Sequence, residues 1–171
     1  MDILIQQGII GIITGILTTA ILFTLKVFWT AKVTPFLASI RYQGVIVSGQ
    51  WSGFAEVTEK EIEEKKLEGT PFKSEHSLFL NQNAHNLTGS LLFKFSNPEK
   101  KFSIDFNVNG YMWEGYITLN FTPKDKRVTS YATALLKLHD GGHTLVGSWL
   151  FRDVIKENVL QTSMFLSRQE Q

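Results

Sequence analysis

The stretch from Ile3 to Leu25 contains no charged residue. As an α-helix it would be roughly 34 Å long, enough to cross a hydrocarbon core of about 30 Å. A cleaved signal peptide is the competing interpretation, but the chain starts with Asp2 rather than a basic cluster, and no small-x-small cleavage site follows the run directly. A buried soluble helix is disfavoured because no charged face interrupts the apolar run. The sequence therefore predicts a transmembrane helix.

Basic residues follow this span and give it a direction. Lys26, Lys32 and Arg41 come after it with no acidic residue before Glu56, whereas Asp2 is the only charged side chain ahead of it. Positive charge near a span is typical of its cytoplasmic side. We therefore expect the rest of the chain to be cytoplasmic, on a single-pass anchor.

The segment after the span is less apolar. Trp29 stands where an interfacial aromatic residue is expected, and residues 33–40 could lie along the headgroups as an amphipathic stretch bent at Pro35. A second short span is the alternative for this segment, which Lys32 and Pro35 interrupt. We divide the chain into residues 1–42, the anchor with its juxtamembrane segment, and residues 43–171.

Small residues recur on one face of the predicted helix. Gly11, Gly15 and Thr19 follow one another at four-residue spacing. In lipid, small residues allow two helix backbones to approach closely, so this face is a candidate for self-association. The alternative is that glycine is simply more common in membrane helices than in soluble ones.

From residue 43 onward the apolar period changes from helical to two, which indicates strands. Phe102 to Val108 and Trp113 to Phe121 alternate on either side of Asn109-Gly110, a dipeptide suited to a two-residue type I′ turn. This turn would pair Phe106 with Trp113 and Ile104 with Gly115, with both apolar sets facing inward.

A second hairpin is predicted around Gly141-Gly142. It pairs Ala134 with Trp149, so that a small residue faces a large one. The same register also pairs Ala132 with Phe151 and Leu138 with Leu145.

Further strands are predicted at 45–57, 75–82, 87–96 and 158–167, with turns at Asn97-Pro98 and Thr122–Asp125. Sequential hairpins favour a closed up-and-down barrel over a sandwich, because they need no crossover. The fold class is therefore mainly β: an N-terminal transmembrane helix followed by a small antiparallel barrel of about eight strands. The polar segment 59–68 is expected to be a solvated loop or short helix over a barrel end.

The sequence offers little that resembles an active site. No phosphate-binding glycine loop, dinucleotide fingerprint, nucleophile elbow or His-Glu-x-x-His motif occurs. The chain has no cysteine, and His139 and His143 flank a turn whose glycines the turn itself requires. Basic and acidic residues are nearly balanced, which argues against a nucleic-acid polymer as partner. We expect no enzyme, metal or cofactor.

Binding in the interior or mouth is the default hypothesis for a barrel without catalytic residues. Stacking on a base is assigned to Trp51, Tyr111, Tyr116 and Tyr131, and contact with phosphates to Lys137 and Arg152, with Lys94 as a further candidate. Trp113 and Trp149 are on the face predicted to be interior, so core packing is the simpler role for both.

Two resemblances follow from these residues. The segment Gly49-Gln50-Trp51-Ser52-Gly53 is similar to the Gly-x-Trp opening of lipocalin-like barrels. The whole plan, an apolar N-terminus from Ile3, a basic juncture at Lys26 and Lys32 and a barrel opening near Trp51, resembles the two-transmembrane β-strand-rich membrane effectors associated with CD-NTases in bacterial cyclic-oligonucleotide-based anti-phage signalling.

The second resemblance implies a mechanism. A cyclic dinucleotide made during infection binds the cytoplasmic barrel, the anchored subunits form a homo-oligomer, and their helices disrupt the lipid of the bacterial inner membrane. The alternative is a membrane-anchored lipocalin-like barrel that acts as a scaffold for a partner protein or as a lipid-binding module.

Overall fold

A computed structural model describes residues 2–57, 71–152 and 159–169. The chain forms two compact units, Met1–Tyr42 and Gln43–Gln171. The polar segment 59–68 lies outside the described residues.

The first unit is helical. It consists of α1 (Asp2–Phe28), a π-helical turn η1 (Trp29–Val33) and α2 (Thr34–Arg41). Proline has no N–H and its ring clashes with the carbonyl four residues earlier, so a wider turn just before Pro35 lets the helix continue. The stretch expected to bend at Pro35 thus remains helical to Arg41.

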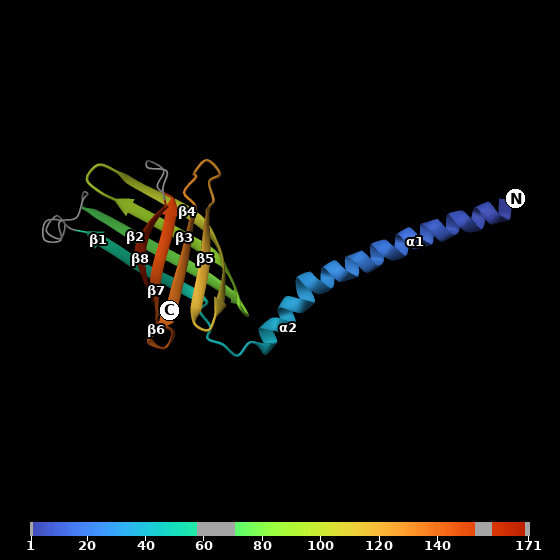
Figure 1. Ribbon diagram of the computed structural model, residues 1–171, viewed down its shortest axis with the longest axis horizontal. Helices are drawn as coiled ribbons and strands as arrows, with labels where there is room; N and C mark the ends of the chain where they lie inside the picture. The colour runs from blue at the N-terminus through green and yellow to red at the C-terminus, as the bar shows by residue number, and fades with distance from the viewer. Residues whose placement is uncertain (1, 58–70, 153–158, 170–171) are drawn as a thin grey trace. The chain divides into compact units, whose positions relative to one another are not determined.

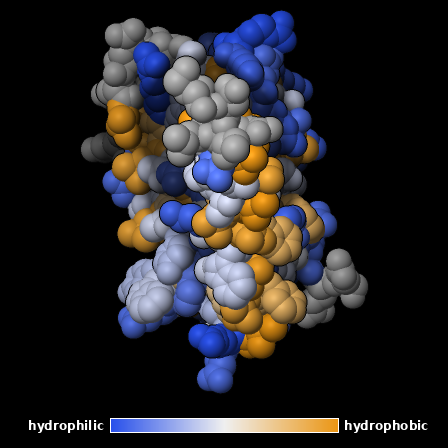
Figure 2. Space-filling view, turned by 90° about the vertical axis from the view of Figure 1, so that its right-hand side faces the viewer, coloured by the Kyte–Doolittle hydropathy of each residue, from blue (hydrophilic) through white to orange (hydrophobic). Residues whose placement is uncertain are grey.

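The helix exposes hydrophobic side chains along its length. Figure 2 shows hydrophobic residues, in orange, exposed on the face of the molecule that it draws. Residues Gln7–Arg41 form one helix that is long and apolar enough to cross a membrane, by length and composition. The predicted long apolar helix is therefore present, and it is the one such helix within the described residues.

The second unit is a closed antiparallel barrel whose strands follow one another in chain order (Figure 1). The strands are β1 (Gly49–Val57), β2 (Phe72–Asn83), β3 (Asn86–Ser96), β4 (Lys101–Trp113), β5 (Tyr116–Pro123), β6 (Ala132–His139), β7 (Thr144–Arg152) and β8 (Val159–Arg168). Pairing of Trp51 with Arg168 and of Ser52 with Ser167 closes the barrel between β1 and β8. The predicted up-and-down barrel is therefore confirmed.

The up-and-down order gives the barrel two distinct ends. At the entry end, residues 43–48 lead into β1, and the β2–β3, β4–β5 and β6–β7 turns lie there. At the far end, β3 is connected to β4 and β5 to β6. These two names are used below.

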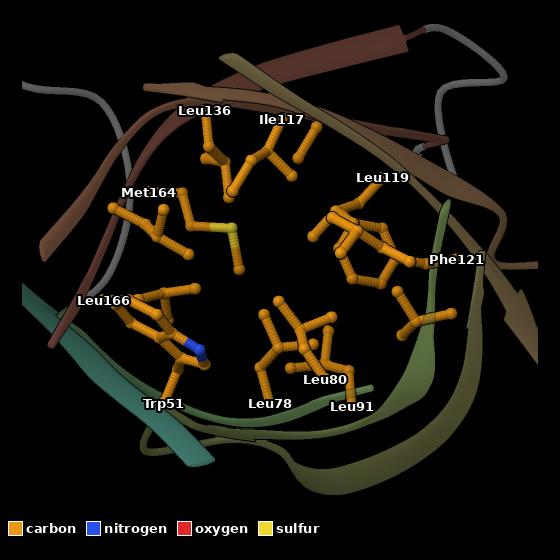
Figure 3. Packing of buried hydrophobic residues seen from close by; sticks show 14 of the residues in the cluster. Trp51, Leu78, Leu80, Leu91, Ile117, Leu119, Phe121, Leu136, Met164 and Leu166 are labelled. Carbon is orange, nitrogen blue, oxygen red and sulfur yellow. The ribbon is translucent and has the colours of Figure 1, made fainter. Parts of the chain in front are cut away.

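Alternating residues of every strand meet in one hydrophobic core (Figure 3). In β5, for example, Ile117, Leu119 and Phe121 are buried while the residues between them are exposed. Leu78, Leu91 and other side chains from the opposite wall complete the core (Figure 3). Burial of this set supplies most of the driving force for closing the barrel.

The Gly141-Gly142 hairpin has the predicted register. Ala134 pairs with Trp149, as expected, and Trp149 is buried in the core. The turn is a short 3-10 segment, η2 (Asp140–Gly142), in which Gly141 has a positive φ of 65°. The small-against-large pairing was a reliable guide to register here.

The predicted turn at Asn109-Gly110 is wrong. Both residues lie inside β4, and the chain turns at Glu114-Gly115, where φ is +50° and +79°. As a result, Phe106 pairs with Pro123, and Trp113 points outward. The ladder between β3 and β4 continues to Tyr111. A turn at 109–110 would remove its last three residue pairs, those of residues 109, 110 and 111.

Candidate functional site

The structure places Trp51 in the core at the entry end. Its side chain is fully buried, and Nε1 donates a hydrogen bond of 2.9 Å to the carbonyl oxygen of Val47. The guanidinium of Arg168 lies 5.5 Å from the ring centre and donates to the carbonyl oxygen of Ser48 at 2.6 Å. These contacts hold the segment entering β1 and leave no face of the ring at the surface.

Three other predicted residues lie on the outer wall near the entry end. Tyr111 stacks on His85 with ring centres 5.5 Å apart. Tyr116 pairs with Lys137, and the Lys137 ammonium lies 5.5 Å from the Tyr116 ring centre. All three side chains are exposed and face away from the interior.

The last two predicted residues lie at the far end. The backbone N–H of Arg152 donates to the carbonyl oxygen of Tyr131 at 3.3 Å, and both residues are exposed. The six residues therefore divide into a core group, an outer-wall group and a far-end group. They do not form one site.

A different set of residues surrounds an open depression of about 440 Å³ at the far end of β2, β3 and β4. Three lysines and two phenylalanines line it together with Glu75, Ser96 and Ser103. The lysines are Lys73, Lys94 and Lys101, and the phenylalanines are Phe95 and Phe102. We refer to it as the basic depression.

The charges around the basic depression are unbalanced in favour of cations. Glu75 is shared, since its carboxylate lies 3.2 Å from the Lys73 ammonium and 4.0 Å from that of Lys94. Lys101 forms no ion pair with any described residue. The pairs are half-exposed and therefore weak, so both lysines of the Glu75 pairs remain able to contact a bound anion.

Aromatic rings lie at the same end of the barrel but on the inner face of the sheet, because Phe95 and Phe102 directly follow the outward-facing Lys94 and Lys101 in their strands. Phe95 stacks on Phe102 with centres 5.2 Å apart and on Phe72 at 5.7 Å. The Lys100 ammonium lies 5.4 Å from the Phe102 ring centre. Cations on the outer face at this end of the barrel, with partly exposed rings on its inner face, suit a ligand that reaches over the barrel rim with phosphate on one side and a planar base on the other.

The aromatic contacts continue from these rings deeper into the barrel. Phe102 contacts Phe93, which contacts His76 and Trp149 at centre distances of 5.1 and 5.3 Å. Burial lowers the pKa of His76 to about 4, so this imidazole is neutral at physiological pH. Its Nδ1 and the Nε1 of Trp149 are buried and have no hydrogen-bond partner among the described residues.

Sequence reasoning identified one member of the basic depression, Lys94. It missed Lys73 and Lys101, which lie opposite Ser96 in the adjacent strands β2 and β4. A visible signal was the basic character on both sides of the Asn97-Pro98 turn, where Lys94 precedes and Lys100 and Lys101 follow.

On the helix, Gly11, Gly15 and Thr19 are exposed, and a shallow groove passes Gly15 and Thr19. A Cβ added at either glycine would meet no atom within 4 Å. The Thr19 hydroxyl donates to the carbonyl oxygen of Gly15 at 2.8 Å, so it is satisfied within its own helix.

No group of three or more His, Asp or Glu side chains suited to a metal ion occurs among residues 2–57, 71–152 and 159–169. Comparison of the chain with protein-family models, with curated proteins and with solved structures gives no match.

Proposed function

We propose that this protein is a membrane-anchored effector of bacterial antiviral signalling whose barrel binds a cyclic dinucleotide. The observation that carries the proposal is the basic depression, where three lysines gather on the outer face of the barrel, with the partly exposed rings of Phe95 and Phe102 on the inner face at the same end. A cyclic dinucleotide offers both complements, two phosphates and two planar bases. The proposal assigns the barrel no catalytic role.

The contacts available there are strong enough for specific binding. An ionic hydrogen bond to phosphate contributes roughly 1.5 to 3 kcal/mol, and a base stacked on an aromatic ring roughly 1 to 3 kcal/mol. Two contacts of each kind sum to roughly 5 to 12 kcal/mol, which is set against an association cost of about 4 kcal/mol or more. The depression is open, so the ligand reaches it without any rearrangement of the core.

Binding leads to function only if the ligand prefers the assembled state, because equal affinity for both states shifts no equilibrium. We assign assembly to the helix face of Gly11, Gly15 and Thr19, where backbones can approach closely. Homo-oligomers of the helices would then disrupt the inner membrane.

A charge reversal at Lys101 tests the proposal. The full-length protein in detergent should show ligand-dependent thermal stabilisation with at least one member of a cyclic di- and trinucleotide panel. Lys101→Glu should weaken that ligand at least about tenfold, because it replaces an attraction to phosphate by a repulsion. The midpoint without ligand should be unchanged, since Lys101 is exposed and has no ion pair among the described residues.

Lys126→Glu is the matched control, because Lys126 is exposed in the β5–β6 connection and does not line the depression. Equal losses in both variants would indicate a general charge effect and contradict the assigned site. If no member of the panel stabilises the folded protein, the anchored-scaffold alternative replaces the proposed function.

The proposed orientation has a separate test. Because Lys26, Lys32 and Arg41 follow the span, a reporter fused after Gln171 should be active only if it functions in the cytoplasm. A C-terminal alkaline phosphatase that is active in the periplasm would overturn both the orientation and the nucleotide proposal, since the nucleotide is made inside the cell.

A further inference from the structure

An exposed row of mainly apolar side chains crosses the outer wall of the barrel near the entry end. Its members are cross-strand partners in sequence: Trp113 pairs with Tyr116, Tyr116 with Lys137, Lys137 with Val146, and Val146 with Phe165. Since neighbours in a ladder share a face of the sheet, the row is continuous from β4 to β8. We call these five residues the outer row.

The rings of the outer row are about half exposed, so they contribute little to the hydrophobic core. Trp113 is 56% exposed, Tyr116 49% and Phe165 55%. Contiguous exposed apolar side chains on a soluble surface generally mark a binding surface. The proposed nucleotide site does not explain this row, because none of its members lines the basic depression.

We propose that the outer row binds the headgroup region of the lipid bilayer. Tryptophan and tyrosine combine an apolar ring with a polar tip, which suits the boundary between headgroups and acyl chains. Lys137, with its ammonium 5.5 Å from the Tyr116 ring, adds a cation beside these rings that can pair with an anionic headgroup. His85 extends the row, because its ring lies 4.9 Å from that of Trp113.

The composition of the row favours lipid over a second protein surface. Lysine is depleted at the centre of protein interfaces, yet Lys137 lies in the middle of this row. A bilayer tolerates lysine there, since its apolar stem lies along the surface and its ammonium reaches the headgroups.

Because the barrel is connected to the helix, a weak contact with lipid is enough to hold the outer row at the membrane. The backbone between Arg41 at the end of α2 and Gly49 at the start of β1 can extend at most about 29 Å. A barrel tethered this closely to a membrane-spanning helix meets lipid at a high effective concentration, so contacts too weak to recruit a free protein can still bind. This inference does not depend on the nucleotide proposal.

Single-cysteine labelling tests the inference, because the natural chain contains no cysteine. Val146→Cys places a fluorophore within the outer row, and Ser103→Cys places one on an exposed outward position at the far end. The full chain is reconstituted in phosphatidylcholine–phosphatidylglycerol vesicles that contain a lipid with a nitroxide on its headgroup. Quenching at position 146 should be at least about threefold stronger than at position 103.

Adding Trp113→Ser and Tyr116→Ser to Val146→Cys should reduce quenching to the level of position 103, with an unchanged thermal midpoint showing that the barrel is folded. Equal quenching at positions 146 and 103 in the original pair would overturn the inference. A second outcome would also overturn it. If position 146 is shielded from the soluble quencher iodide but is not quenched by the lipid nitroxide, and if dilution with lipid removes the shielding, a second copy of the chain covers the row.

Discussion

Trp51→Ala should destabilise the barrel by about 3 to 5 kcal/mol, because it removes a fully buried indole and leaves a cavity. The variant also loses the hydrogen bond from Nε1 to Val47 and the contact with Arg168. Domains of this size are stable by about 5 to 15 kcal/mol, so the loss is a large fraction of the total. Thermal or urea unfolding of the full-length protein in detergent measures it.

Trp113→Ala is the matched control, since it removes the same side chain from an exposed position. We expect a change within about 1 kcal/mol. If Trp51→Ala keeps the stability of the parent but no longer binds a cyclic dinucleotide, Trp51 contacts the ligand. That result would contradict its place in the core.

The helix and the barrel were predictable because each depends on a pattern that extends over many residues. The uncharged run over Ile3–Leu25 satisfies one length requirement, and the alternation in β2 to β8 repeats one period. The pairing of Ala134 with Trp149 was predictable for a different reason, because volume complementarity excludes a slip by one residue.

The candidate site was less predictable because it depends on neighbours across strands. Lys73 and Lys101 are remote from each other in sequence, and both lie opposite Ser96 only once two ladders have formed. The alternation pattern tells which face a side chain takes, but an aromatic residue on the outer face, such as Tyr116, has the same pattern whether it meets ligand, lipid or water. Choosing aromatic residues by type therefore combined three separate regions of the barrel.

The misplaced turn shows how a strong local signal can be overridden. Asn109-Gly110 is well suited to a type I′ turn, yet the structure uses Gly110 where two backbones approach closely. Glu114-Gly115 provides the positive φ values for the turn instead, and the ladders on both sides of β4 gain length. Pairing along the whole strand outweighs the preference of one dipeptide.

Gly110→Ala should therefore destabilise the barrel by about 3 kcal/mol or more, enough to leave a large unfolded fraction in a protein of marginal stability. A Cβ at this position would lie 2.2 Å from the carbonyl oxygen of Thr118 and 2.6 Å from Cδ2 of Leu119. The first atom is backbone in the neighbouring strand, so relief requires β5 to move. Chemical unfolding of the full-length protein in detergent measures the loss.

Gly115→Ala is the control that separates the two possible turns. Gly115 has a φ of +79° but nothing within 4 Å of an added Cβ, so the substitution strains one turn residue at a cost of about 1 to 2 kcal/mol. With the turn at Glu114-Gly115, Gly110→Ala must cost more than Gly115→Ala. A turn at Asn109-Gly110 would reverse this order, because Gly110 would then be an open turn residue and Gly115 a strand residue facing the core. The ranking of the two alanine variants therefore tests the register of β4 and β5 directly.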